Sequence, residues 1–417
     1  MCWFSRGLDL MNLSFQQWLI ESGFIWAQFL IAIPWMITLF FSENNSNAKP
    51  KTIALLSTLA TMFILGAIFP PIFHTFLQET NSIETAGRVY GGIFQTQLIL
   101  DTFVLTFFVL LKIWPKGGAV AQAAFREGIR QPMFWLLSSL ALFALLVSPF
   151  IPYFTFGEDL IMVKELGYDT IMLAAVVFGT LAASISVSEE IEGRTAVTLM
   201  SKPISRRQFL IGKFVGILLS AFLMSSILFV IFQSILLYKH WLDRMDPVSN
   251  PEWIKLFLSN STLPSETKDL INGLAFWIQH TLETFPGLIL SFCQVSVLVS
   301  ISVSLATRLP MVVNLSTVLV IYFLAHLTPV LVAIGEKAKA TDPDSPVSRL
   351  LGFMAGVFDL FLPGLEFFRV GPAIVGDTPP DFIPFAIYVL SVSFYGLIYT
   401  TVALIVGLIL FEDRDLA

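Results

Sequence analysis

The sequence contains little charge. Of its 417 residues only 13% are Asp, Glu, Lys or Arg, whereas a soluble globular domain carries about 25%. Apolar side chains make up 56%, and the mean hydropathy is +0.79. A soluble fold needs a polar exterior that this composition does not supply. The composition therefore excludes a cytosolic enzyme and a disordered chain, and the net charge of −6 argues against nucleic-acid binding, which favours a basic surface.

Residues that carry chemistry are also scarce. The two cysteines, Cys2 and Cys293, indicate no disulfide framework. The four histidines occur singly, without the spacing that zinc sites use, so we expect no metal site. A phosphate-binding loop would read G-x-x-x-x-G-K-(S/T), but the one Gly-Lys pair, Gly212-Lys213, has Arg207 in place of the first glycine. We therefore expect no enzyme activity and no bound cofactor in this chain.

Apolar runs indicate an all-α polytopic membrane protein. A helix needs about 20 mostly apolar residues to cross the hydrocarbon layer. About nine runs qualify: 24–41, 53–77, 91–111, 133–156, 170–188, 214–238, 284–306, 309–335 and 382–411. The run 350–368 contains Asp359 and Glu366, each costing about 2.5–3.5 kcal/mol at the bilayer centre. We expect this tenth run to lie at the membrane surface.

Basic residues predict the orientation. The loops after the third and fifth runs are rich in Lys and Arg, which marks cytoplasmic loops. Alternation then places the N-terminus outside and the C-terminus in the cytoplasm. The loop 157–167 and two long segments, 239–283 and 336–381, become external loops.

A possible domain boundary lies near Gly117-Gly118. It separates a three-helix region of unknown role, 1–117, from a six-helix part, 118–417. Between positions 121 and 129, apolar residues recur at helical spacing opposite a charged face, and Pro132 follows. We predict an amphipathic elbow helix at the cytoplasmic interface, leading into the fourth run.

The stretch 188–213 reads SEEIEGRTAVTLMSKPISRRQFLIGK. Its acids precede a short predicted helix, about 194–201, and Lys202 follows, as the helix dipole favours. Pro203 ends that helix, and Ser205 and Gln208 have the spacing of a capping box that opens the next. The pattern suits a contact with a cytosolic partner, although a solvated basic loop explains it equally well.

At these residues the sequence resembles permeases of the ABC-2 class of ABC transporters, especially the bacterial branch near the copper-site maturation permease of nitrous oxide reductase. The matching motif is E-x-E-x-(G/R)-T…LL-x-x-P-(I/V)-S-R…(F/L)-x-x-G-K, and Met200 departs from its second leucine. The segment 362–368 resembles the external P-N-(L/F)-x-x-F signature, with Gly364 in place of asparagine. The matching motif residues are Glu190, Glu192, Thr195, Leu199, Pro203, Ile204, Ser205, Arg206, Phe209, Gly212 and Lys213.

The resemblance implies a six-helix ABC-2 permease core preceded by three extra helices. It implies export across a bacterial inner membrane, pairing with a second permease half (a homodimer or a paralogue), and a separate ATPase subunit that binds ATP and Mg²⁺. The segment 189–201 would be the coupling helix, and the loop 308–310 a second contact. The implied coupling residues are Glu189, Glu190, Glu192, Gly193, Arg194, Thr195, Leu199, Lys202, Pro203, Ser205, Arg206, Gly212 and Lys213.

Two other classes remain open. An ion-driven secondary transporter places ionisable groups at mid-membrane, and Asp101 and His326 are the candidates for an intramembrane polar site. A polytopic enzyme acting on lipid-linked substrates requires clustered acids or metal ligands, which the sequence does not show. A purely mechanical subunit, which transmits ATPase motion without translocating a substrate, is a variant of the permease reading.

Overall fold

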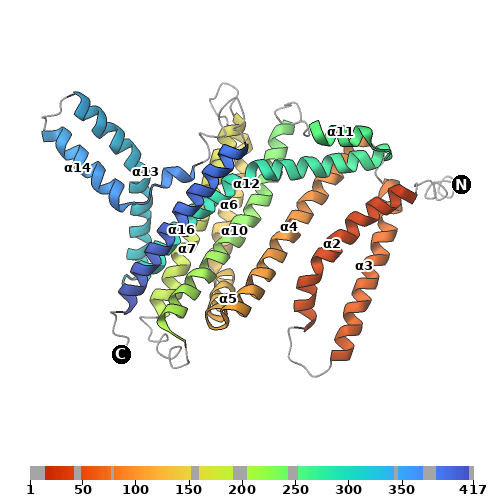
Figure 1. The fold of residues 1–417 in the computed structure, drawn as a ribbon, viewed down its shortest axis with the longest axis horizontal. Coiled ribbons are helices and arrows are strands. Elements are labelled where there is room, and N and C mark those ends of the chain that lie inside the picture. The colour runs from red at the N-terminus through yellow and green to blue at the C-terminus, as the bar shows by residue number, and fades with distance from the viewer. Residues whose placement is uncertain are drawn as a thin grey trace. The chain divides into compact units, whose positions relative to one another are not determined.

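The computed structural model describes residues 15–41, 48–76, 79–151, 159–190, 204–242, 252–341, 346–369 and 382–412, and these are helical nearly throughout (Figure 1). The chain divides into two compact units. The first comprises Met1–Val109 and Asp246–Glu283, and the second comprises Leu110–Met245 and Thr284–Ala417. The long helix α12 (Ser265–Ala306) contributes its first part to the first unit and the remainder to the second.

The first unit is built from the N-terminal helices and an insertion from later in the chain. Its other helices are α2 (Phe15–Phe41), α3 (Ala48–Phe76), α4 (Thr80–Ile113), which ends just inside the second unit, and the short α11 (Glu252–Asn260). The described part of this insertion, 252–283, which was predicted as an external loop, is therefore largely helical and packs with the N-terminal helices.

The second unit contains the rest of the helices. In chain order they are α5 (Pro115–Arg130), α6 (Pro132–Val147), η2 (Ser148–Phe150), α7 (Asp159–Ala183), the π-helical turn η3 (Ser184–Glu189), α10 (Arg206–Leu242), α13 (Met311–Thr341), α14 (Pro346–Phe361), η4 (Leu365–Phe368) and α16 (Phe382–Glu412). Figure 1 shows α14 folded back along the last turns of α13.

Seven helices in the described part of the chain are long and apolar enough to cross a membrane. They coincide with the third to ninth predicted runs. The first two runs form α2 and α3, but α3 has only a shorter apolar stretch, Leu55–Pro71, so the count of nine is not confirmed. The run 350–368 divides into α14 and η4, and neither is among the spanning helices.

Several helices begin earlier or end later than hydropathy predicts. The helix α7 begins at Asp159, inside the predicted loop 157–167, and α5 begins at Pro115 rather than near 121. The predicted external loop 336–381 includes the end of α13 and all of α14. The reason is physical, because hydropathy detects only the part of a helix that lies in the hydrocarbon layer.

Small residues bring the helices of the second unit together. On α10, Gly212 and Gly216 are one turn apart and face the elbow helix α5. A Cβ atom at Gly216 would lie 2.3 Å from the carbonyl oxygen of Ala121, and one at Gly212 would lie 2.9 Å from that of Gly117. Such close backbone approach at small residues is how helices associate in membranes. The predicted apolar stripe of the elbow is confirmed, since Ala121, Ala124 and Gly128 are buried in this contact.

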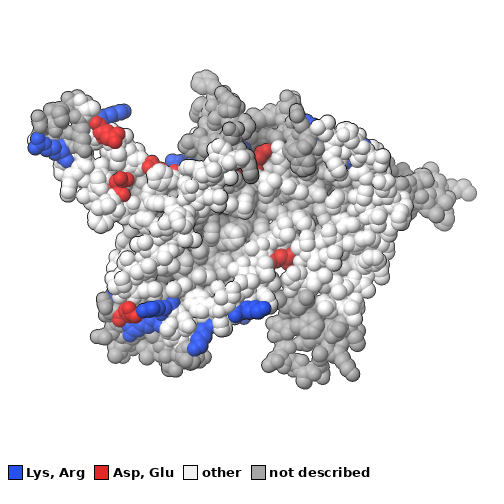
Figure 2. Space-filling view, in the orientation of Figure 1, with Lys and Arg blue, Asp and Glu red and all other residues white. Residues whose placement is uncertain are grey.

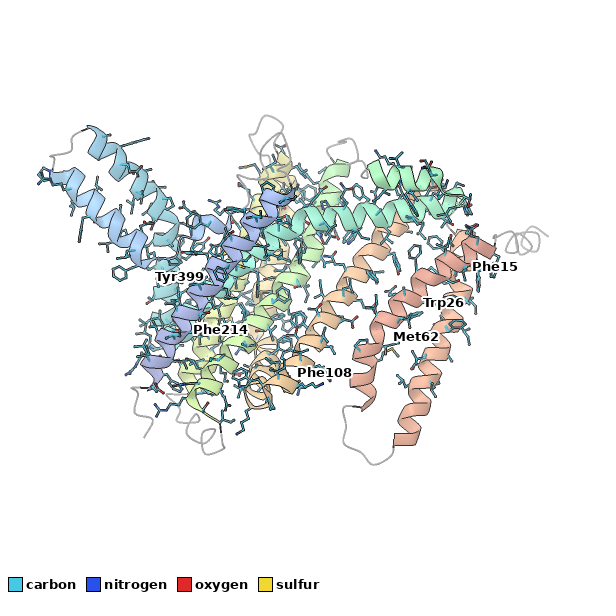
Figure 3. All side chains as sticks on the ribbon, viewed as in Figure 1. Phe15, Trp26, Met62, Phe108, Phe214 and Tyr399 are labelled. Atoms are coloured by element: carbon cyan, nitrogen blue, oxygen red, sulfur yellow. The ribbon has the colours of Figure 1, made fainter. Side chains whose placement is uncertain are left out.

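Close approach of helices at glycine also occurs in the first unit. A Cβ at Gly273 of α12 would lie 2.0 Å from the carbonyl oxygen of Glu84 on α4, and Gly91 makes room for the ring of Trp277. Trp26, which is labelled in Figure 3, extends from α2, and its indole stacks on Phe63 of α3 at a ring-centroid distance of 4.7 Å. Aromatic side chains and glycines therefore set the spacing of these helices.

Candidate functional site

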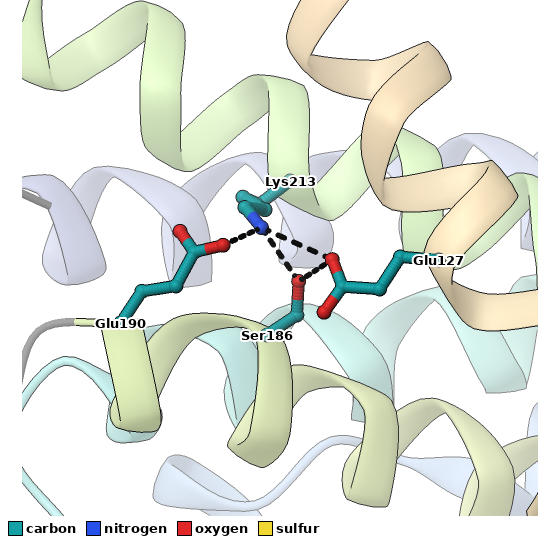
Figure 4. A network of polar contacts seen from close by, with 4 residues as sticks. All are labelled: Glu127, Ser186, Glu190 and Lys213. Atoms are coloured by element: carbon teal, nitrogen blue, oxygen red, sulfur yellow. Dashed lines mark hydrogen bonds and ion pairs between the residues drawn. The ribbon is translucent and has the colours of Figure 1, made fainter. Parts of the chain in front are cut away.

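A buried lysine joins three segments of the second unit (Figure 4). The Lys213 side chain is only 5% exposed. Its Nζ atom lies 2.6 Å from Oε1 of Glu190, 2.8 Å from Oγ of Ser186 and 3.4 Å from Oε2 of Glu127. Ser186 Oγ in turn donates to Glu127 Oε2 at 3.1 Å. We call Glu127, Ser186, Glu190 and Lys213 the lysine junction.

Local sequence places each member of the junction. The backbone N–H of Ser205 donates to Gln208 Oε1 at 3.1 Å, and that of Gln208 donates to Ser205 Oγ at 3.2 Å. This reciprocal pair is the predicted capping box, which is confirmed and fixes the start of α10. Lys213 follows two turns later, and the neighbouring Gly212 allows α10 to approach α5 closely enough for Lys213 to reach Glu127.

The π-helical turn η3 supplies Ser186 and is itself held by hydrogen bonds. Asn314 of α13 is fully buried, and its Nδ2 donates to Ser184 Oγ at 2.8 Å and to the carbonyl oxygen of Ser302 at 3.1 Å. The hydroxyl of Ser188 donates to the carbonyl of Leu309 at 3.1 Å. Single π-helical turns occur frequently at functional sites. Here the turn connects the lysine junction to the loop 308–310.

The same end of the second unit carries basic side chains. Arg206 Nη1 donates to the carbonyls of Phe411 and Glu412 at 3.0 and 2.8 Å, and Arg308 Nε donates to that of Leu410 at 2.9 Å. Cations at a helix C-terminus satisfy its last carbonyls and complement its dipole, so these arginines hold α16 in place. Figure 2 shows blue basic side chains gathered along the lower edge of this unit.

The electrostatics of the junction suit a structural link. A buried ammonium with two carboxylates and a hydroxyl is paired, so its charge is tolerated in a low-dielectric setting. Removing one partner of such a group typically costs about 3–5 kcal/mol. No group of three or more metal-binding side chains occurs among the described residues. The four side chains of the junction hold α5, η3 and α10 together.

The structure brings together part of the predicted coupling set. Glu190, Ser205, Arg206, Gly212 and Lys213 all lie at this end of the second unit. The rest of the set is outside what the structure describes: this applies to the side chain of Glu189 and to Glu192, Gly193, Arg194, Thr195, Leu199, Lys202 and Pro203.

The two predicted intramembrane residues lie in different units. Asp101 is on α4 in the first unit, and both its carboxylate oxygens are buried without a hydrogen-bond partner. His326 is on α13 in the second unit, where its Nδ1 lies 2.9 Å from the carbonyl oxygen of Tyr322 one turn earlier. His326 is therefore accounted for by its own helix.

Sequence reasoning missed three residues of this region. Glu127 is one of several charged residues on the polar face of the predicted elbow helix, and the motifs include neither Ser186 nor Asn314. A signal existed for the last two. Serines at 184, 186 and 188 interrupt the end of an apolar run, and Asn314 stands alone in another. Polar side chains within membrane helices generally bond across to a neighbouring helix.

Fold and site together define a polytopic helical membrane protein in which the described motif residues Glu190, Arg206 and Lys213 lie at one end of the second unit. Residues 118–416 match the model of a family described as ABC-2 family transporter protein. This range is well over half of the chain, so the chain belongs to the ABC-2 transporter family and is a permease component. The match begins at Gly118 and leaves the first three helices outside it. No curated protein sequence matches the chain.

Proposed function

We propose that this chain is the permease subunit of a bacterial ABC exporter, driven by ATP hydrolysis on a separate subunit. The observation that carries the proposal is the lysine junction, because Glu190 is the last described residue before the segment 191–203. In the family this segment contains the coupling helix that contacts the ATPase. A force on it would act first on Glu190.

A few hydrogen bonds connect Glu190 to the membrane helices. Lys213 connects Glu190 to α10 and to Glu127 on the elbow helix α5. Ser188 and Asn314 connect the adjoining π-helical turn to the loop 308–310 and to α13. Movement of the coupling segment would therefore shift α5, α10 and α13 together. Nucleotide and Mg²⁺ bind to the partner, and this chain responds to the partner's motion and contributes to the translocation path.

The positive-inside rule supports placing the junction in the cytoplasm. Arg206, Arg207 and Arg308 lie at this end of the second unit. The C-terminus is then cytoplasmic and the N-terminus external, in the inner membrane. A second permease half completes the translocation path, because one six-helix core is half a transporter in this family.

Co-purification from the native host tests the proposal. The chain, tagged and extracted in mild detergent, is expected to elute with a stoichiometric subunit that carries a phosphate-binding loop and hydrolyses ATP. Neutralising Glu190, Glu192 and Arg194 together should release that subunit while the chain still inserts and remains folded. Elution of the wild-type chain alone, without ATPase activity, would contradict the proposal.

A matched control separates coupling from general loss of charge. Glu336 and Lys337 on α13 and Asp359 on α14 are two acids and one base, all exposed, and therefore match the test triple in charge. Neutralising these three should leave the ATPase subunit bound. If both triple variants release it equally, the coupling assignment of 189–201 is wrong.

An ion-driven secondary transporter is the second candidate, and Asp101 is the observation that favours it. A buried carboxylate without a partner in a membrane helix is costly and usually functional. If the chain elutes without an ATPase, proton or sodium flux into proteoliposomes should depend on Asp101. A fluorescent indicator trapped inside the liposomes would report that flux. Asp101→Asn would then abolish the flux.

A further inference from the structure

One carboxylate in a membrane helix of the first unit has no role in the ATP-driven mechanism proposed above. Asp101 lies in the middle of the apolar run 91–111 of α4, and both its carboxylate oxygens are buried without a hydrogen-bond partner among the described residues. The nearest charged residues on α4, Arg88 and Lys112, are 13 and 11 positions away, which is about 20 and 16 Å along a helix. The helix itself therefore supplies no counter-charge to Asp101.

The described parts of the other first-unit helices also place no cation in contact with Asp101. Glu21 is the one charged residue of α2, and residues 52–73 of α3 contain no charged residue and no histidine. The titratable side chains described in α11 and in the first-unit part of α12, none of which bonds to Asp101, are Lys255, Glu266, Lys268, Asp269, His280 and Glu283. An ionised Asp101 would therefore be a costly charge in the apolar layer.

Two polar side chains on the same face of α4 donate hydrogen bonds to α2. Tyr90 Oη donates to the carbonyl oxygen of Phe24 at 2.7 Å. Gln97 Nε2 donates to the carbonyl oxygen of Gln28, also at 2.7 Å. Tyr90, Gln97 and Asp101 are separated by seven and four positions, so the three side chains follow one stripe of the helix. Both α2 groups that this stripe contacts through hydrogen bonds are acceptors. An ionised carboxylate also only accepts, whereas a protonated one donates through its O–H.

We propose that Asp101 is a proton-binding site, and that within the membrane it is held as a neutral carboxylic acid. Binding the proton removes a charge that an apolar environment disfavours. It also makes Asp101 a third donor on the stripe of Tyr90 and Gln97. Release of the proton would place a charge in the contact between α4 and α2 and weaken it. The inference goes beyond the proposed function, since Asp101 precedes the family match at Gly118 and its protonation requires neither ATP nor an ion gradient.

Modification by dicyclohexylcarbodiimide, an apolar reagent that enters the bilayer, tests the protonation state. The reaction requires the acid form. The carboxyl oxygen forms a bond to the central carbon of the reagent, the proton moves to one of the reagent's nitrogens, and no group leaves. In apolar surroundings the adduct rearranges to a stable N-acylurea of the same mass, which mass spectrometry locates in the sequence.

The full chain is treated with this reagent in nanodiscs at neutral pH. Asp101 should be labelled severalfold more than Glu412, an acid at the end of α16 whose side chain is 63% exposed. Asp101→Asn should remove the label from α4 and leave any label on Glu412 unchanged. Labelling of Asp101 that does not exceed that of Glu412 would overturn the proposal.

The same variant tests whether the folded protein uses the neutral form. Asn has nearly the size of Asp, carries no charge and donates through its amide, so the melting temperature of Asp101→Asn at neutral pH should match that of the wild type. Thr102→Ala is the control, because the Thr102 hydroxyl is exposed and bonds within its own helix, to Leu98 at 2.7 Å. A melting temperature clearly lower for Asp101→Asn than for Thr102→Ala would show that the fold requires the charge, and would overturn the proposal.

Release of the proton gives a further readout. As the pH is raised from acidic to alkaline, only the wild type gains a charge within the membrane, so its melting temperature should fall below that of Asp101→Asn. Labelling of Asp101 should decrease over the same pH range. Parallel stability profiles together with constant labelling would overturn reversible proton binding. These readouts do not involve the ATPase, so the proton site and the transport proposal fail separately.

Discussion

The helices of the two units pack in the same way but are held by different polar contacts. In both, glycines let helices approach to backbone contact, as Gly216 does on α10 and Gly273 on α12. The polar groups that hold the helices together differ between the units. In the first unit, Gln95 accepts from the indole of Trp277 at 2.8 Å, and the Arg88–Glu84 ion pair of 2.9 Å lies within one helix. In the second, a buried ammonium joins two carboxylates from different segments. Packing by small residues thus occurs in both units, whereas the lysine junction joins separate segments of the family core by charge.

The largest expected effect breaks that junction. Lys213→Met leaves two partly exposed carboxylates facing each other, with side chains 39% and 24% exposed, so we expect the free energy of unfolding to fall by about 2–4 kcal/mol, less than for a fully buried pair. Thermal denaturation in detergent measures the change. Adding Glu190→Gln and Glu127→Gln should recover most of the loss, because no uncompensated charge then remains. If the triple variant is no more stable than Lys213→Met, the charge argument fails.

Replacing a glycine at a helix contact should give the next largest loss of stability, and we expect this loss in both units. Gly216→Ala and Gly273→Ala each drive a methyl group into a backbone carbonyl, and overpacking costs about 1–3 kcal/mol. The control is Gly356→Ala on α14, where nothing lies within 4 Å of the added atom. There alanine should stabilise by up to about 1 kcal/mol through helix propensity. Equal melting temperatures for the three variants would contradict the packing account.

Loss of Asn314 should have a similar or smaller effect, confined to the second unit. Asn314→Ala removes the donor to Ser184 and Ser302, which we expect to cost about 1–3 kcal/mol. Ser316 is two residues later on the same helix, is exposed, and bonds only within the helix. Ser316→Ala therefore serves as the control, and its melting temperature should match that of the wild type.

The smallest expected effect concerns the start of α10. Ser205→Ala removes the cap of that helix and should cost about 1 kcal/mol. Ser234→Ala, at an exposed mid-helix serine on α10, should be close to neutral. Proteolysis near the start of α10 should increase for Ser205→Ala alone. Equal cleavage of the two variants would show that the cap does not hold this helix end.

The sequence predicted the spans of the family core well and their ends less well. Apolar runs located seven spanning helices because each must match the hydrocarbon layer. The capping box at Ser205 and the apolar stripe of the elbow were local patterns, and both are confirmed. The beginning of α7 at Asp159 was missed, because a helix continues outside the membrane without any apolar signal.

The candidate site was only half predictable. Motif residues indicated Glu190 and Lys213, but a motif does not state that the two side chains touch. The third partner, Glu127, lies 86 positions before Lys213, and nothing local distinguishes it from the other charges of the elbow. Likewise, the packing of residues 252–283 with the N-terminal helices is a long-range property that a hydropathy pattern cannot reveal.

The measurement that tests the central claim most directly is a double-mutant cycle on the ATPase activity of the purified native complex. The variants are Lys213→Met, Glu190→Gln and the double change. Arg207→Met is the control, since the Arg207–Glu412 pair at the same end is exposed and 3.7 Å apart. If the lysine junction transmits motion, each single change lowers activity with the ATPase still bound, the double change lowers it no further, and Arg207→Met has little effect. Unchanged activity in both single variants, or effects that simply multiply, would contradict the account.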